Sequence, residues 1–342
     1  MKQKIAILGS TGSIGKSLLK IISKDRKNFE ISLLTANENY KTLLLQAEKF
    51  KVKNLIITNK KYFLIAKSKN KKKINIYNNF NNFKKIFPKK IDYVMSSIVG
   101  LDGLHPTIKI IPFTKKIAIA NKESIICAWN LIKKKLNKYK TKFVPVDSEH
   151  FSIWYALKNN SLSNLDKLYI TASGGPLLNV PLVKYKSLNI KKITKHPNWN
   201  MGAKISVDSS TMMNKVFEVI EAKKIFNVDY SQISILIHPK SYIHTILKFK
   251  NGMIQIIAHD TTMDIPISNT LLKKNFDIIK TNALNINKLN NLQLSKPFNN
   301  KFPSIEIINK LPKKDSLFET VLVSINDELV KLFLSKKINY LT

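Results

Sequence analysis

The polar side chains of residues 196–226 have the types and spacing to bind a phosphorylated ligand and a metal ion. Asn214 and Glu218 are four residues apart and Lys215 and Glu218 are three apart, so a helix would present an amide, an ammonium and a carboxylate on one face. Just upstream, Asp208-Ser209-Ser210 predicts the helix N-cap. An amide, a cation and a serine at a helix N-terminus suit a phosphate, and the carboxylate suits a metal. The spacing alone fits a capped amphipathic helix with a solvated polar face equally well.

Two more carboxylates follow an extended segment. Val144 and Val146 share one face of this segment, and the same alternation puts Asp147 and Glu149 on one side and Ser148 on the other. Two carboxylates on one side of a strand end either repel each other or share a cation. Mg²⁺ and Mn²⁺ accept such oxygen ligands and keep positions open for a substrate. The pattern therefore predicts a metal site, with an acidic loop of no function as the alternative.

Two loops could complete such a site. Ser173-Gly174-Gly175 follows the predicted strand 169–171, and two glycines after a serine allow an anion or another backbone segment to approach closely. The tight loop 196–202 is aromatic and contains His196 and Trp199.

A glycine-rich turn near the start of the chain predicts a dinucleotide-binding site. The apolar run 4–8 reads as a buried strand, Gly9, Gly12 and Gly15 follow it, and a helix-like segment comes next. These glycines let backbone N–H groups approach a pyrophosphate at the helix N-terminus. A tight turn without a ligand is the alternative.

Polar residues follow two further strands of this predicted domain. Asn37-Glu38-Asn39 ends the strand 30–36, where an acidic residue binds the ribose 2′-OH of NAD and a basic one accommodates the 2′-phosphate of NADP. Glu38 alone favours NAD, although Lys41 lies close. Asn121-Lys122-Glu123 ends another strand, and ligands of open α/β sheets bind outside the carboxyl ends of strands. We therefore expect both groups in the cofactor crevice, with a simple helix start as the alternative for the second.

The elements that must hold these residues can be traced along the chain. Short apolar runs alternate with helix-like segments through residue 146, which is typical of an α/β domain with a parallel sheet. A short β-like piece is expected at 204–207, directly before the predicted N-cap. Two alternating strands, 241–249 and 253–258, surround the turn Asn251-Gly252, and 317–334 has a helical pattern.

The composition is globular and strongly basic. Hydrophobic residues make up 44%, which excludes a disordered chain. The formal charge of +36, from 58 Lys+Arg against 22 Asp+Glu, would ordinarily indicate nucleic acid or an anionic membrane as a partner. The lysines are spread along the chain among many Asn and Ile residues, and no recognised nucleic-acid motif accompanies them. We therefore interpret most of the charge as solvated surface and expect no specific nucleic-acid partner.

Cysteine content and hydropathy indicate the compartment. Cys127 is the single cysteine, so an internal disulfide is excluded and a reducing compartment is favoured. Residues 1–4 lead directly into the first strand without a signal peptide, and no apolar stretch approaches the ~20 residues of a membrane span. We expect a cytoplasmic protein with no membrane partner.

Five motifs, read in order, resemble those of one enzyme family. They are GSTGSIG at 9–15, NKE at 121–123, VDSEH at 146–150, SGGPL at 173–177 and HPNWNMGAKISVDSSTMMNKVFEVIEA at 196–222. From residue 1 to about 265, and more weakly beyond, the chain resembles the 1-deoxy-D-xylulose 5-phosphate reductoisomerase family. The resemblance implies an NADPH- and divalent-metal-dependent rearrangement, by retro-aldol and aldol steps, and reduction to 2-C-methyl-D-erythritol 4-phosphate in non-mevalonate isoprenoid biosynthesis. Mg²⁺ or Mn²⁺ would serve, with Co²⁺ as a further candidate.

The resemblance also implies residue roles. The catalytic residues would be Asp147, Glu149, His196, Lys215 and Glu218, and the three carboxylates among them would bind the metal. The substrate would be held by Ser148, Ser173, His196, Trp199, Ser209, Asn214, Lys215 and Glu218, with the loop of His196, Trp199 and Met201 closing as a flap. The nucleotide would be held by Thr11, Gly12, Ser13, Ile14, Asn121, Lys122, Glu123 and Gly202, with Asn37, Glu38 and Asn39 at its ribose.

The family fold implies a division into domains within a homodimer. We expect an N-terminal Rossmann-type domain at 1–146, a central α/β catalytic domain at 147–272, a linker at 273–299 and a shortened C-terminal helical domain at 300–342.

Two departures from the family pattern stand out. Family members usually carry a Gly-Lys/Ser-Asn type sequence where this chain has Asn37-Glu38-Asn39, which weakens the basic contact expected at the 2′-phosphate. The other motifs still favour NADPH. The chain ends at Thr342, where the family continues through further helices, so we expect the helical domain to be short.

Two other functions are weighed against this enzyme. A basic protein could use a degenerate enzyme fold to bind RNA or another polyanion, but the three carboxylates and Lys215 are all present. Another NAD-linked dehydrogenase could share the fold, but a simple dehydrogenase does not need three metal-binding carboxylates.

Overall fold

The computed structural model describes residues 1–70, 74–199, 201–272, 279–298, 300–314 and 316–341. The chain divides into two compact units. Unit 1 comprises Met1–Ser124, Ala128–Asp147 and Met263–Lys280, and unit 2 comprises Ile125–Cys127, Ser148–Thr262 and Thr281–Thr342. The linker predicted at 273–299 and the helical region predicted at 300–342 include residues 273–278, 299, 315 and 342, which lie outside the described residues.

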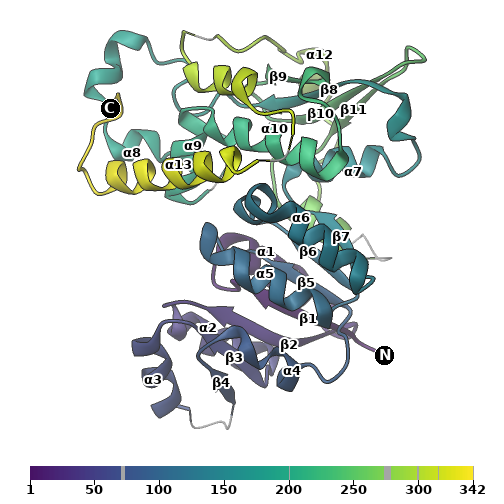
Figure 1. The fold of residues 1–342 in the computed structure, drawn as a ribbon, viewed down its shortest axis with the longest axis vertical. Coiled ribbons are helices and arrows are strands. Elements are labelled where there is room, and N and C mark those ends of the chain that lie inside the picture. The colour runs from purple at the N-terminus through teal and green to yellow at the C-terminus, as the bar shows by residue number, and fades with distance from the viewer. Residues whose placement is uncertain (71–73, 200, 273–278, 299, 315, 342) are drawn as a thin grey trace. The chain divides into compact units, whose positions relative to one another are not determined.

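Unit 1 is built on a sheet of seven strands that pair in parallel (Figure 1). Their order is β4-β3-β2-β1-β5-β6-β7, with bounds β1 Gln3–Leu8, β2 Phe29–Ala36, β3 Asn54–Ile57, β4 Asn75–Tyr77, β5 Tyr93–Ser96, β6 Lys116–Ile119 and β7 Lys142–Pro145. The strand order reverses at β1, which pairs with both β2 and β5. Such a reversal is where doubly wound sheets bind nucleotides. The predicted Rossmann-type α/β architecture is confirmed.

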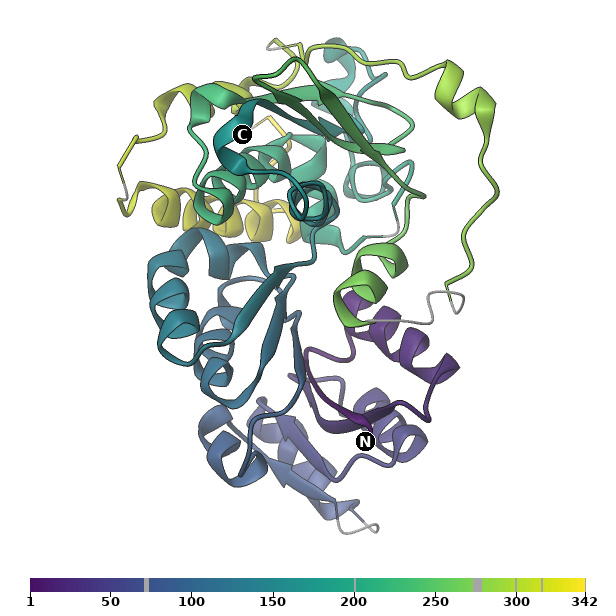
Figure 2. The same ribbon diagram turned by 90° about the vertical axis from the view of Figure 1, so that its right-hand side faces the viewer.

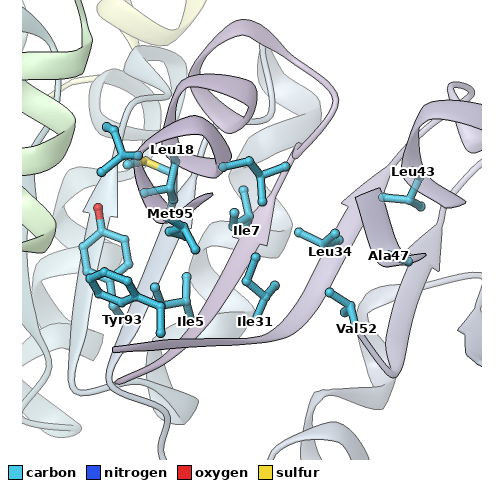
Figure 3. Packing of buried hydrophobic residues seen from close by; sticks show 14 of the residues in the cluster. Ile5, Ile7, Leu18, Ile31, Leu34, Leu43, Ala47, Val52, Tyr93 and Met95 are labelled. Atoms are coloured by element: carbon cyan, nitrogen blue, oxygen red, sulfur yellow. The ribbon is translucent and has the colours of Figure 1, made fainter. Parts of the chain in front are cut away.

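Helices connect these strands and bury their apolar runs. They are α1 Ser13–Lys24, α2 Tyr40–Phe50, α3 Lys60–Ser68, α4 Phe83–Ile86, α5 Leu104–Ile110 and α6 Lys122–Lys138. Figure 3 shows Ile5 and Ile7 of β1 in one cluster with Leu18 of α1 and Leu34 of β2. The strands read as nearly continuous apolar runs because helices exclude water from both faces of such a sheet.

A helix from much later in the chain completes unit 1. α11, Asp264–Leu271, packs on α1, and Lys20 forms an ion pair with Asp264 at 3.0 Å. The buried Thr270 is 2.8 Å from the Tyr93 hydroxyl of β5, and Ile267 is fully buried in the core of unit 1. The helix α11 therefore belongs to unit 1, within the segment Met263–Lys280.

Unit 2 contains a second, mixed sheet with the order β11-β10-β8-β9 (Figures 1 and 2). The bounds are β8 Leu165–Ala172, β9 Ile233–Ile237, β10 Ile243–Phe249 and β11 Ile254–Ala258. β8 pairs in parallel with β9, whereas β10 is antiparallel to both β8 and β11. The predicted hairpin around Asn251-Gly252 is confirmed, and Gly252 has a φ of +87°, a conformation that glycine adopts readily.

The helices of unit 2 are α7 Ser148–Ala156, α8 Ile190–Ile193, α9 Ala203–Ser210, α10 Met213–Phe226, α12 Ile286–Asn290 and α13 Phe318–Leu334. α7 and α10 pack on this sheet, whereas α8 and α13 pack on α9. The core packs Val219 and Phe226 of α10 against Leu168 and Ile170 of β8. The helix predicted at 317–334 is confirmed as α13. No helix in the described parts of the chain has both the length and the apolar character that crossing a bilayer requires.

Two predictions about the segment before α10 are wrong. Residues 204–207, expected to be β-like, belong to helix α9, and α10 starts at Met213 rather than after Asp208-Ser209-Ser210. Between the two helices Met212 has a φ of +64°, which interrupts the helical path. Asp208 does not cap α10 because its side chain bonds to Lys204, one turn earlier in α9, and to Asn326, 118 residues away, a contact that the local sequence does not reveal.

Candidate active site

Lys215 lies at the centre of a buried polar cluster in unit 2. It is on the first turn of α10, and its Nζ lies 2.7 Å from Glu149 Oε1 and 2.6 Å from the backbone oxygen of Thr171. The third contact of this ammonium is Glu218, one turn further along α10, whose other carboxylate oxygen accepts an N–H from Asn214. The face predicted for the spacing 214, 215 and 218 is present, but Lys215 and Glu218 are buried in the protein rather than solvated, and Asn214 is half-buried.

The opposite charges of this cluster stabilise each other's ionised form. Burial alone would raise the pKa of Glu149, but the Lys215 ammonium, together with the charge of His244 and the hydrogen bonds from Lys215 and Ser148, holds that pKa well below its usual range. Burial opposes the charge of Lys215, yet Glu149 and Glu218 together raise its pKa. The cluster is therefore an ionised one, in which each charge is paired.

The carboxylates meet by a different geometry from the one predicted. Glu149 does not continue an extended segment after Asp147, because Ser148 begins α7 and Glu149 lies in its first turn. The expected alternation of side chains is wrong at this point. Ser148 Oγ donates to Glu149 Oε2 at 2.6 Å instead of pointing to the opposite side.

Three carboxylates nevertheless lie together. Asp147 directly precedes α7, and one oxygen from each of Asp147, Glu149 and Glu218 lies within 4.8 Å of the others. A second group, Asp147 with His150 and Glu221, satisfies the same distance. His150 and Glu221 were given no role in the sequence analysis, although they stand three residues after Asp147 and Glu218, the same spacing that put Lys215 and Glu218 on one helix face.

The loop 173–175 and the His196 ring are joined by a hydrogen bond beside this cluster. His196 Nε2 is 3.1 Å from Ser173 Oγ, which also accepts the backbone N–H of Gly175 at 3.0 Å. His196 Nδ1 accepts the backbone N–H groups of Asn198 and Trp199. Burial, reinforced by the Lys215 charge, lowers the pKa of His196 to about 4. The ring is therefore neutral near pH 7 with its proton on Nε2, from which it donates to Ser173.

Ser209 is close to the same loop. A Cβ added at Gly175 would lie 2.5 Å from the Ser209 backbone oxygen, and Gly175 has a φ of +67°. Only glycine fits this approach between the loop and α9. The structure thus brings together Ser173, His196, Ser209 and Lys215 from four parts of the sequence. Of the predicted flap, Trp199 contacts His244 edge-on with ring centroids 6.1 Å apart, and Asn200 lies outside the described residues.

A cavity of about 310 Å³ opens beside Ser173. It is lined by Ser173, Gly175, Pro176, Leu178, Asn179, Lys192, Lys195, Pro197 and Pro239. Two ammonium groups and no carboxylate are among these described lining residues, so the surroundings favour an anionic ligand.

In unit 1 the glycine turn has the tight geometry of a dinucleotide site. Gly9 has a φ of +84°, and a Cβ at Gly15 would lie 2.5 Å from the Gly9 oxygen. Gly12 is the N-cap of α1 and provides no side chain to cap it. The first N–H groups of α1, at Ser13 and Ile14, are therefore suited to a pyrophosphate.

The other predicted nucleotide residues have local partners. Asn37 Oδ1 accepts a hydrogen bond from Thr58 at 2.8 Å, Glu38 accepts one from Asn59 at 3.2 Å, and Asn39 caps α2 through the N–H of Thr42.

The Asn121-Lys122-Glu123 group starts α6. Asn121 caps this helix and donates to the oxygens of Ile98 and Gly100, so it fixes the loop after β5. Glu123 is bonded by Asn121, and Lys122 is 2.9 Å from Asp147. Gly202 is the N-cap of α9 in unit 2, and among the described residues no atom outside its chain neighbours lies within 4 Å of a Cβ added there. The nucleotide contacts of these residues stay a prediction.

Models of one family match most of the chain. The model described as 1-deoxy-D-xylulose 5-phosphate reductoisomerase matches residues 5–129, and two models of the C-terminal domain of this enzyme match 143–226 and 260–342. Among curated proteins, the 1-deoxy-D-xylulose 5-phosphate reductoisomerase of Pelagibacter ubique is 59% identical over 341 residues, which are 99% of this chain and 88% of the relative. That of Clostridium tetani is 37% identical over 346 residues, covering 99% and 89%.

Solved structures of the same enzyme family are also similar to this chain. The reductoisomerase from Zymomonas mobilis in complex with NADPH has a TM-score of 0.89 at 30% identity, covering 100% of this chain and 89% of its own. A DOX-P reductoisomerase in complex with NADPH, fosmidomycin and magnesium has a TM-score of 0.91 at 30% identity, covering 99% and 86%. Sequence identity over nearly the whole chain and a shared fold lead to one conclusion: the chain belongs to the 1-deoxy-D-xylulose 5-phosphate reductoisomerase family.

Proposed function

We propose that this chain rearranges and reduces 1-deoxy-D-xylulose 5-phosphate to 2-C-methyl-D-erythritol 4-phosphate, using NADPH and a divalent metal. It is an NADP-dependent oxidoreductase of non-mevalonate isoprenoid precursor biosynthesis. One observation carries this function beyond family membership: the buried cluster of Glu149, Lys215 and Glu218 is intact and lies beside the pocket of Ser173 and neutral His196.

The three carboxylates fit a divalent metal. Asp147, Glu149 and Glu218 offer only oxygen atoms, and these lie within 4.8 Å of one another, as ligands of one ion must. Mg²⁺ prefers such donors, and Mn²⁺ and Co²⁺ accept them. When bound, the metal supplies Lewis-acid polarisation of the substrate's oxygen atoms.

The chain's own residues bind and orient the phosphate end of the substrate. Ser173 and Ser209 offer hydroxyl groups, Asn214 an amide and Lys215 a charge. An ammonium has three N–H donors, and those of Lys215 have acceptors in Glu149, Glu218 and Thr171. Lys215 must exchange one of these partners to bind phosphate, so occupation of the metal site and of the phosphate site is coupled through this residue. Ser148, which donates to Glu149, is proposed to contact the substrate backbone.

The loop 196–202 is proposed to exclude water. His196 fixes the start of the loop because its Nδ1 accepts two of the loop's own backbone N–H groups. Asn198 ties the loop to Pro239 and Ser241 through hydrogen bonds of 2.6 and 2.8 Å. Trp199 would then cover the bound substrate.

NADPH is the proposed nucleotide, held by the turn of Thr11, Gly12, Ser13 and Ile14 on unit 1. Solved relatives that carry NADPH support this assignment. The remaining predicted contacts are Asn37, Glu38, Asn39, Asn121, Lys122, Glu123 and Gly202. Glu38 accepts a hydrogen bond from Asn59 and is the one carboxylate at the expected ribose position. A carboxylate there disfavours the 2′-phosphate of NADPH, so the ratio of the rates with NADPH and NADH shows how strongly Glu38 affects the choice of nucleotide.

We also propose a cytoplasmic homodimer without a specific nucleic-acid partner. A single cysteine suits a reducing compartment. β11 is an edge strand of unit 2 and exposes Ile254 and Ile256 at 59% and 46%, and apolar edges of this kind pair with a partner.

A test combines turnover with one substitution. The wild-type chain should oxidise NADPH in the presence of 1-deoxy-D-xylulose 5-phosphate and Mg²⁺ or Mn²⁺, as followed by reduced-nicotinamide absorbance. Glu218→Gln removes one ligand charge and should abolish this metal-dependent turnover while the variant still binds NADPH. NADH is assayed in parallel.

Two results would contradict the proposal. Unchanged turnover in Glu218→Gln would remove this residue from the metal site. A folded wild-type chain without turnover on either nucleotide would show that the activity is absent. Fosmidomycin, the ligand of a solved relative, should bind only with metal present, because the proposed chelation needs the ion.

A further inference from the structure

A buried ionic network joins α9 to the C-terminal helix α13. Lys204 Nζ lies 2.9 Å from Asp208 Oδ2, one turn along α9, and 3.0 Å from Asp327 Oδ1 of α13. Asn326 Nδ2, also from α13, donates to Asp208 Oδ1 at 2.8 Å. Asp208 is 1% exposed, so its charge depends on these partners rather than on water.

A second polar contact comes from beyond α13. The Tyr340 hydroxyl donates to Ser210 Oγ at 3.2 Å. Its ring packs edge-on against Phe333 and Tyr185, with centroids 6.0 and 5.7 Å apart. Burial raises the pKa of Tyr340 to about 12, so the phenol is a neutral donor over the physiological range.

These contacts hold α9 on the side of α13, while Ser209 of the same helix lies against the glycine loop at Gly175. Lys204, Val207 and Asp208 are three and four residues apart, so they share the face toward α13 (Figure 1). Val207 packs there against Val330 and Phe333. Ser209 lies between Asp208 and Ser210, both of which are bonded to the C-terminal segment, and its backbone approaches the glycine loop.

We propose that Asn326, Asp327 and Tyr340 are positioning residues that hold α9, and with it Ser209, in place to bind the substrate phosphate. The inference rests on the proposed function of α9 as a phosphate site. Binding groups must be held within about 0.5 Å of their productive position. Asp208 and Ser210, the residues directly before and after Ser209, are both bonded to the C-terminal segment and provide this constraint. The C-terminal segment thus acts on the phosphate without touching it.

The first test compares two tyrosines of one cluster. Tyr340→Phe removes only the hydroxyl that bonds to α9. We expect the KM for 1-deoxy-D-xylulose 5-phosphate to rise about 2- to 10-fold, which corresponds to the loss of one hydrogen bond. The KM for NADPH should not change. Tyr185→Phe is the control, because it removes the hydroxyl of the ring that Tyr340 contacts, and no described residue bonds that hydroxyl.

The second test compares neighbouring carboxylates of α13. Asp327→Asn removes the charge that pairs with Lys204 and should raise the same KM. Glu328→Gln removes a charge from the same helix, but Glu328 pairs on the surface with Lys331 and should leave the KM unchanged. The affinity for inorganic phosphate, measured by calorimetry in all four variants, should fall with Tyr340→Phe and Asp327→Asn only.

Thermal unfolding of each variant shows whether the substituted residue positions the phosphate site or only stabilises the fold. A lower Tm with an unchanged KM and unchanged phosphate affinity would overturn the proposal, as would equal effects of test and control variants. A wild-type chain that binds phosphate without turnover would contradict the proposed reaction instead, and phosphate affinity would still decide the positioning role. A folded wild-type chain that does not bind phosphate would overturn the proposal as well.

Discussion

Lys215 shows how one residue can connect two proposed binding sites. Its side chain is buried, and its ammonium bonds two of the proposed metal-binding carboxylates and the backbone just before the Ser173 loop. The helical spacing of Lys215 and Glu218 predicted their contact. The partnership with Glu149, 66 residues away, depends on how α7 packs on α10 and could not be predicted from local spacing.

His196 gives a residue-scale prediction about pH. Its pKa of about 4 in the folded chain lies below the ordinary 6.5, so the unfolded chain takes up this proton first as the pH falls. The free energy of unfolding of the wild type should therefore decrease as the pH falls from 6.5 to 4. The free energy of unfolding of His196→Gln should decrease less over the same range, because this variant lacks the imidazole. Urea unfolding at several pH values measures the difference.

His105→Gln is the control for that experiment. It removes an exposed imidazole and should leave the pH dependence as in the wild type. A His196→Gln curve parallel to that of the wild type would mean that His196 titrates normally in the folded chain.

At the scale of elements, the sequence predicted the glycine turn well and the α9–α10 junction poorly. The turn is local: Gly9 and Gly15 lie on one strand–turn–helix unit, and their steric requirement is visible in their spacing. The junction is not local. Asp208 looks like a cap, but a tertiary bond to Asn326 and an ion pair with Lys204 of the same helix occupy it, and the chain turns at Met212 instead.

The turn supports an element-scale prediction. In Gly15→Ala the new methyl group would lie 2.5 Å from the backbone of Gly9 and Ser10, which cannot yield as a side chain can. We expect a loss of about 1–3 kcal/mol in the free energy of unfolding, the usual cost of overpacking. Gly12→Ala is the matched control, since its methyl group would make an ordinary 3.5 Å contact with the Gly9 oxygen. Equal unfolding midpoints in denaturant would contradict the prediction.

At the scale of the whole molecule, alternation of strands and helices predicted the α/β class, because the inner parallel strands are apolar and largely buried. The assignment of α11 to unit 1 could not be predicted in this way. Its partners, such as Tyr93, are far away in sequence, and nothing within residues 264–271 identifies them.

The proposed homodimer is tested at this scale. Ile256→Lys places a charge on the exposed face of the edge strand β11 and should shift sedimentation from dimer to monomer. Val183→Lys, at an exposed apolar residue of another segment, should leave the dimer intact. A wild-type monomer, or a dimer in both variants, would show that β11 is not the interface.

The return of α11 to unit 1 affects how the chain acquires its structure on the ribosome. Ile267, Leu271 and Leu272 are part of the core of unit 1, so that core lacks a helix when β7 has been made. At about 5–20 residues per second, synthesis from β7 to the end of α11 takes roughly 6–25 s. During this interval the nascent N-terminal unit exposes the apolar patch that α11 later covers, and this patch is the place where a chaperone would act.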